Sequence, residues 1–199
     1  MKHDKITNIR LTAFVVLAGL VAGLGPSSSR AEINLFGEYW DNVARAAAQN
    51  DASRVRALVG SGGNPNQADE QFHTALHYAA MNGNLTIIAI MIKASAKLDI
   101  KDKLGNTPLH LAGDRNQAEA VQLLLDVGAS VDPENKNGMT PLMLAASRGN
   151  IAIVQSLLAK GASVTKTDFT GRDAAGWAEE SHRPAVVQAI RRAQSAKRS

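Results

Sequence analysis

The chain has 199 residues, 45% hydrophobic and 20% charged, so a globular protein with a sizeable core is expected rather than a disordered one. It contains no cysteine, which excludes disulfides, thiolate metal sites and cysteine nucleophiles. The formal net charge is +4 and the pI is about 9.5. A basic pI alone would favour nucleic acid or an acidic surface as a partner, so the positions of the charges matter.

The first 31 residues have the layout of a secretory signal peptide. Residues 1–10 are basic, residues 11–24 carry no charge, and small residues follow. Ser29 and Ala31 fit the small-x-small cleavage site, so we expect cleavage near Ala31. The sequence therefore predicts that the mature chain is periplasmic or secreted.

The alternative for this segment is an uncleaved anchor. A helix over residues 11–24 would be roughly 21 Å long, against a hydrocarbon core of about 30 Å, which favours cleavage. Membrane contact is expected only if the segment is retained. Residues 32–190 contain 14 basic and 17 acidic residues, so the basic pI belongs to the signal and the last nine residues. We therefore expect no nucleic-acid partner.

A 33-residue period organises the rest of the chain. The tetrapeptides beginning at Thr74, Thr107 and Thr140 read TALH, TPLH and TPLM. One column at this spacing contains only alanine: Ala46, Ala79, Ala112, Ala145 and Ala178. The period predicts five repeats, over residues 41–73, 74–106, 107–139, 140–172 and 173–193.

Each repeat is predicted to form two short antiparallel helices. A threonine or aspartate acts as the N-cap of the first helix, and an asparagine or glycine that tolerates a left-handed backbone ends it. The second helix shows apolar residues at i, i+3 and i+4 and ends at glycine. Ser95 replaces that glycine in the second repeat and should reduce stability. Polar loops join the repeats, with Gly105, Gly138 and Gly171 recurring in them.

These motifs resemble those of the ankyrin-repeat family, in T-P-L-H-x-A-A, in V-x-x-L-L and in the terminal Gly-Ala. The resemblance covers residues 41–193. It implies an all-α solenoid of about five helix-turn-helix repeats with hairpin loops. It also implies a monomeric, non-enzymatic module without a cofactor, whose partner is another protein.

The histidines and loop carboxylates do not form a recognisable catalytic or metal-binding motif. The resemblance gives His77 and His110 a structural role, in which the imidazole links the threonine hydroxyl to the loop backbone. His73 lies in a loop. Asp99 and Asp102 are interpreted as part of a solvated, mixed-charge run beside two lysines. We expect no metal ligands and no catalytic residues.

The resemblance also implies that the loop tips and the concave face of the first helices bind the partner. In this sequence the loop candidates are Glu70, Gln71, His73, Lys103, Leu104, Asn106, Lys136, Met139, Phe169 and Arg172. The helix candidates are Met81, Asp114, Arg115 and Arg148. Leu104 and Phe169 are either binding anchors or packed between neighbouring loops.

The segments at the two ends of the repeat array are predicted to have roles of their own. Residues 32–40, with Phe36, Tyr39 and Trp40, either cap the first repeat or dock a partner. The last repeat is polar on its outer face, as a terminating solenoid requires. Residues 194–199 form a basic tail, which either meets an anionic surface or continues the last helix.

Together these features predict an exported bacterial scaffold that binds another protein in the periplasm. Some exported bacterial proteins that resemble this chain assist catalase in peroxide defence, which is an analogy only. A secreted effector or toxin-neutralising protein is one alternative. A membrane-anchored adaptor is the other.

Overall fold

The computed structural model describes residues 42–196, and the predicted signal peptide, the cap segment 32–40 and residues 197–199 lie outside this range. The described residues form ten helices and no strand, apart from one isolated bridge between Ala68 and Thr74. The helices are α3 (Val43–Ala48), α4 (Ala52–Gly60), α5 (Ala75–Asn82), α6 (Leu85–Lys93), α7 (Pro108–Asp114), α8 (Ala118–Asp126), α9 (Pro141–Arg148), α10 (Ile151–Ala159), α11 (Ala174–Glu180) and α12 (Pro184–Ala196). The prediction of an all-α solenoid is therefore confirmed.

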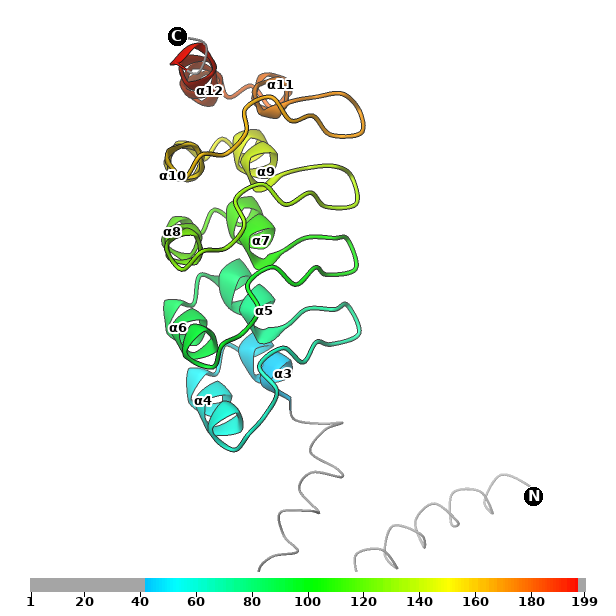
Figure 1. Cartoon of the computed structure of the whole chain (residues 1–199), viewed down its shortest axis with the longest axis vertical. Helices are drawn as coiled ribbons and strands as arrows, with labels where there is room; N and C mark the ends of the chain where they lie inside the picture. Colours follow the sequence, from blue (N-terminus) through cyan, green and yellow to red (C-terminus); the bar gives the residue numbers. More distant parts are fainter. Residues whose placement is uncertain (1–41, 197–199) are drawn as a thin grey trace, which may run out of the picture. The chain divides into compact units, whose positions relative to one another are not determined.

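The helices stack in two columns (Figure 1). The first helices of successive repeats, α3, α5, α7, α9 and α11, pack against one another in chain order. The second helices, from α4 to α12, form the other column, and the hairpin loops project together from the opposite side (Figure 1). This arrangement places equivalent residues of successive loops side by side.

The predicted caps begin the helices. Thr74, Thr107, Thr140 and Asp173 are the N-caps of α5, α7, α9 and α11. The first repeat differs, because α3 has Asn42 as its N-cap, one position later than the period predicts, with its side chain accepting from Arg45 N at 2.7 Å. In each of these five helices the N-cap side chain thus accepts from one amide of the first turn.

Left-handed residues end the helices where the sequence predicts them. Asn50 and Asn116 have φ of 60° and 62°, and Gly83 and Gly149 fill the same position in the repeats between and after them. The predicted departure at Ser95 is also observed, with φ of 56° where the first, third and fourth repeats have glycine. An L-residue in this region is strained, so Ser95 is a local weak point.

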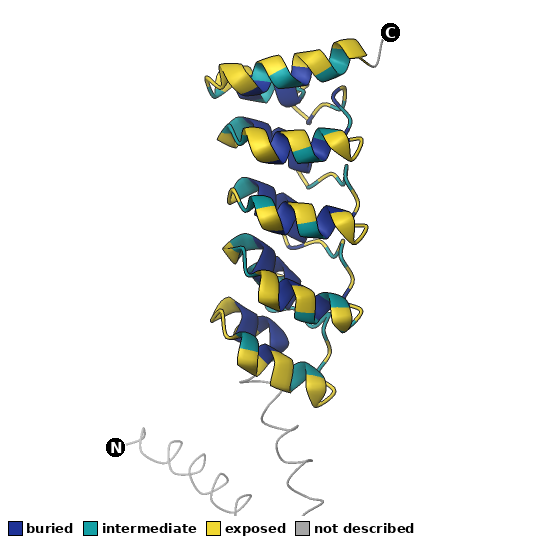
Figure 2. Cartoon of the chain, turned by 90° about the vertical axis from the view of Figure 1, so that its left-hand side faces the viewer, coloured by how far each residue is buried: buried dark blue, intermediate teal, exposed yellow. Residues whose placement is uncertain are grey.

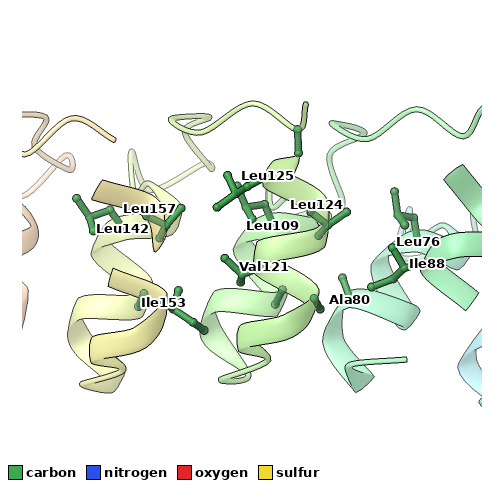
Figure 3. Packing of buried hydrophobic residues seen from close by; sticks show 14 of the residues in the cluster. Leu76, Ala80, Ile88, Leu109, Val121, Leu124, Leu125, Leu142, Ile153 and Leu157 are labelled. Atoms are coloured by element: carbon green, nitrogen blue, oxygen red, sulfur yellow. The ribbon is translucent and has the colours of Figure 1, made fainter. Parts of the chain in front are cut away.

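The core lies between the two columns and between consecutive repeats (Figure 2). All five residues of the alanine column are buried, which lets the first helices approach closely. Larger side chains from both columns, such as Leu109, Val121 and Leu124, fill the space between repeats (Figure 3). No disulfide is available, so the stability of the stack comes from this packing.

The last repeat ends the stack with a charged surface. Glu179 and Arg191 are exposed and form an ion pair between α11 and α12. Helix α12 continues to Ala196, three residues into the segment predicted as a basic tail. Within residues 42–196, no helix has the length and hydropathy that a membrane crossing requires.

Candidate functional site

One aspartate or asparagine organises each hairpin loop. The four residues lie 33 positions apart, at Asp69, Asp102, Asn135 and Asp168. In each loop, Oδ1 accepts from the amide nitrogens two and four residues later, at 2.8–3.0 Å. The main-chain nitrogen of the same residue donates to the carbonyl oxygen four residues later. These bonds hold all four loops in one conformation.

The interpretation of Asp102 as part of a solvated, mixed-charge run is wrong. Its side chain is only 3% exposed, and Oδ1 accepts from the amides of Leu104 and Asn106. Its Oδ2 lies 3.3 Å from His73 Nε2 in the preceding loop. The carboxylate is buried because the loop backbone needs it as an acceptor. Asp99 and the two lysines of the run, Lys101 and Lys103, are exposed.

The second carboxylate oxygen of the loop aspartate can hold an aromatic residue of the following helix. Tyr78 donates its hydroxyl to Asp69, and Trp177 Nε1 donates to Asp168 at 3.0 Å. Burial, together with the bond to Asp69, raises the pKa of Tyr78 to about 12. Burial favours a higher pKa for Asp69, but the hydrogen bonds from Tyr78 and the loop amides outweigh it and lower the pKa. Both aspartate loops are thereby fixed to the helix that follows.

A main-chain ladder joins neighbouring loop tips. Lys103 N donates to Gln71 O at 3.0 Å, Lys136 N to Leu104 O at 2.9 Å, and Phe169 N to Asn137 O at 3.1 Å. The tips therefore have a defined register from one repeat to the next. A ligand that spans several tips would meet a preorganised surface.

The two equivalent histidines are structural, as the family resemblance implies. His77 Nδ1 accepts from Thr74 N at 3.1 Å, and His77 Nε2 lies 3.2 Å from Asn106 O in the next loop. His110 repeats this pattern with Thr107 and Met139 O. Because Nδ1 accepts, Nε2 carries the proton of a neutral ring. Burial lowers the pKa of His110 to about 4 and also lowers that of His77.

The structure separates the predicted loop candidates into two groups. Glu70, Gln71, Lys103, Leu104, Lys136 and Phe169 are exposed, and His73 and Arg172 are partly buried. Asn106 and Met139 are buried, so the expectation that they face a partner is wrong. Asn106 binds the side chains of Asp102 and Asn135, and Met139 belongs to the core cluster.

Arg172 is held by its own repeat. Its guanidinium lies 4.3 Å from the Trp177 ring centroid and pairs with Glu180. Its Nε also donates to Thr170 Oγ1 at 3.0 Å. These contacts fix the side chain at the edge of the last loop.

Three helix candidates meet in one depression. Asp114, Arg115 and Arg148 line a polar hollow of about 640 Å³ where α7 and α9 end, together with Asn150 at the start of α10. Arg148 Nη2 pairs with Asp114 Oδ1 at 2.7 Å. Met81, the fourth helix candidate, is partly buried one repeat away. A larger open hollow of about 1170 Å³ lies on the outer face of α11 and α12.

Phe72 is an exposed aromatic residue that is absent from the predicted loop candidates. Its side chain is 55% exposed, compared with 67% for Leu104 and 77% for Phe169. The signal was present, since Phe72 occupies the column that holds Gly105, Gly138 and Gly171 in the other loops. Phe169 lies against Gly138, where an added Cβ would be 2.8 Å from its ring, yet most of the ring stays exposed. Part of Phe169 is therefore packed against the neighbouring loop, and the rest of its ring is free to act as a binding anchor.

Among residues 42–196, no group of three or more histidine, aspartate or glutamate side chains is placed to hold a metal ion. The polar groups of the loops are used instead to hold the loop backbone and neighbouring repeats.

Comparison with known proteins agrees with this geometry. A family model described as "Ankyrin repeats (3 copies)" matches residues 43–135 and 115–197. The chain belongs to the ankyrin-repeat family. Over 78 residues it is 34% identical to the human protein "Ankyrin repeat domain-containing protein 39". The match covers 39% of this chain and 40% of the human protein, so the chain spans less than half of that relative's length. Proteins built of ankyrin repeats are generally interaction modules.

Proposed function

We propose that this chain is an exported bacterial scaffold whose ankyrin loops bind another protein in the periplasm, where it assists a resident enzyme or a stress response. The observation that carries the proposal is the row of loop tips. It is linked by main-chain bonds and exposes Leu104 and Phe169 among polar neighbours. Exposed apolar residues on a rigid surface are typical anchors of protein–protein interfaces. Export is supported by the sequence pattern of residues 1–31.

The destination is tested by fractionation. The full chain with a C-terminal tag is expressed in a Gram-negative bacterium, and cytoplasm, periplasm, membranes and medium are separated. We expect the protein in the periplasm. Its intact mass should be that of a chain whose first residue is near Glu32. Recovery from the medium would favour a secreted effector, and recovery of the full-length mass from membranes would favour an anchored adaptor.

Binding is tested by affinity capture from the same periplasm, followed by mass spectrometry. The double variant Leu104→Ser with Phe169→Ser should lose the captured protein, because it removes apolar anchors without touching the core. Val127→Ser is the matched control, since Val127 is an exposed apolar residue at the end of α8, away from the loops. Equal capture by all three proteins would contradict a role of the loop tips.

A further inference from the structure

Phe72 occupies a backbone position that suits glycine. Its φ is 62°, compared with 81°, 75° and 82° for the equivalent Gly105, Gly138 and Gly171. The turn is otherwise the same, since Phe72 N donates to Asp69 O at 3.0 Å as the glycines do to their own loop aspartate or asparagine. A bulky L-residue in the left-handed region is strained, and such strain is concentrated at functional sites.

The core does not compensate for this strain. Phe72 is 55% exposed and is not part of the hydrophobic core cluster, and the Lys103 ammonium lies over its ring, 5.9 Å from the centroid. Glycine at this position would keep the turn and remove the strain. The turn and the core therefore do not explain why a phenylalanine stands at this position.

Phe72 extends the apolar row on the loop tips. The main-chain bond from Lys103 N to Gln71 O places its loop directly beside that of Leu104. Phe169 lies two loops further along the same ladder. Adjacent packed helices are about 8–10 Å apart, so three repeat steps span about 24–30 Å. An extended segment of about eight or nine residues covers that length.

Two cations lie between the apolar ends of this row. Lys103 and Lys136 are exposed, and among residues 42–196 neither has a carboxylate within ion-pair distance. The nearby carboxylates of Asp102 and Asp168 are buried in their own loops. Glu134, two residues before Lys136, is exposed but pairs with Lys166, and Glu70 is the exposed acid at the first tip. The middle of the row is therefore complementary to an acidic segment.

We propose that Phe72, Leu104, Lys103, Lys136 and Phe169 form a binding strip for an extended acidic segment of a protein partner, with apolar residues at both of its ends. Phe72 is the strained anchor at the first end. This proposal rests on the proposed function in one respect, that the loop tips bind a protein, and it adds the chemistry of that partner.

The test combines stability with peptide binding. Fluorescein-labelled nine-residue peptide pools carry phenylalanine or leucine at both ends and either two glutamates or two lysines near the centre. Binding is measured by fluorescence anisotropy. We expect the natural protein to bind the acidic pool, more weakly at high salt, and to leave the basic pool unbound. Phe72→Gly should weaken this binding about tenfold or more, while its thermal unfolding midpoint stays equal or rises. Phe72→Ala should also lose binding. It should unfold at a lower temperature than Phe72→Gly, because alanine keeps the strain that glycine removes.

Three results would overturn the proposal. Equal binding by Phe72→Gly would show that the ring is not an anchor. A lower unfolding midpoint for Phe72→Gly would show that Phe72 is a structural residue. Failure of the acidic pool to bind, or equal binding of the basic pool, would exclude the acidic segment. Val127→Ala is the control and should leave peptide binding unchanged. Periplasmic capture tests the proposed function separately, so a captured protein that Phe72→Gly still binds would refute this inference alone.

Discussion

The imidazole Nε2 of His110 lies 3.0 Å from the main-chain oxygen of Met139, the residue that precedes the N-cap of the next repeat. Nδ1 of the same ring accepts from Thr107 N. One buried side chain thus joins the start of its own helix to the end of the following loop. His77 makes the same connection one repeat earlier, to Asn106 O. The neutral ring suits both bonds, since protonation of Nδ1 would remove an acceptor.

We expect the stability of the stack to fall between pH 6.5 and pH 4. The pKa of His110 is lowered to about 4 by burial, so the unfolded chain takes up the proton first as the pH falls. His110 therefore destabilises the fold by at most about 1.4 kcal/mol per pH unit in this window, and His77 adds in the same direction. Urea unfolding at pH 7, 6 and 5 measures the slope.

The matched control is His110→Gln, which cannot titrate. Its free energy of unfolding is lower at pH 7 but should depend less on pH than that of the natural chain. Asp69 and Asp168 have lowered pKa values, so their loss of stability occurs at lower pH, below about 4. Identical slopes for the variant and the natural chain would refute the assignment to His110.

Ser95→Gly should stabilise the protein by about 0.5–1 kcal/mol. Ser95 has φ of 56°, and glycine relieves the strain of an L-residue there at a smaller cost in chain entropy. Gly62, Gly128 and Gly161 occupy this position in other repeats, so the backbone already suits glycine. Thermal or urea unfolding measures the gain. A decrease in stability would mean that the Ser95 side chain makes a contribution that exceeds the strain.

Asp102→Ala should lower the free energy of unfolding by about 2–3 kcal/mol, because buried amides of its loop lose their acceptor. Asp102→Asn should lower it by less than about 1 kcal/mol, since Asn135 performs the same task one repeat later. Urea unfolding compares the two variants. Similar losses for both would show that the negative charge, rather than the acceptor, holds the loop.

Leu124→Ala should lower the free energy of unfolding by about 2–5 kcal/mol, because it leaves a cavity in the core of the central repeat. Leu124 is fully buried between repeats. Lys103→Ala, on an exposed loop tip, should change it by no more than about 0.5 kcal/mol. Denaturant unfolding distinguishes them, and equal losses would contradict the assignment of these residues to core and surface.

The candidate binding surface is only partly predictable from the sequence. The repeat pattern places four candidates on the loop surface, and the structure exposes all of them: Lys103, Leu104, Lys136 and Phe169. Asn106 was selected by the same reasoning and is buried, because the carboxylate of Asp102 and the amide of Asn135 in the next loop surround it. Loop position in one repeat does not show what the neighbouring loop covers.

The sequence by itself determined the helix pairs and, apart from the N-cap of α3 at Asn42, the caps of the first helices, because these depend on residues three or four positions apart and recur every 33 residues. It also pointed to Ser95 as a strained helix end. Only the tertiary structure decided which loop groups are buried and that Phe72 sits exposed on a glycine turn. The reason is physical, since His73 meets Asp102, and His77 meets Asn106, across 29 residues and between separate repeats. Such contacts exist only once the repeats have stacked.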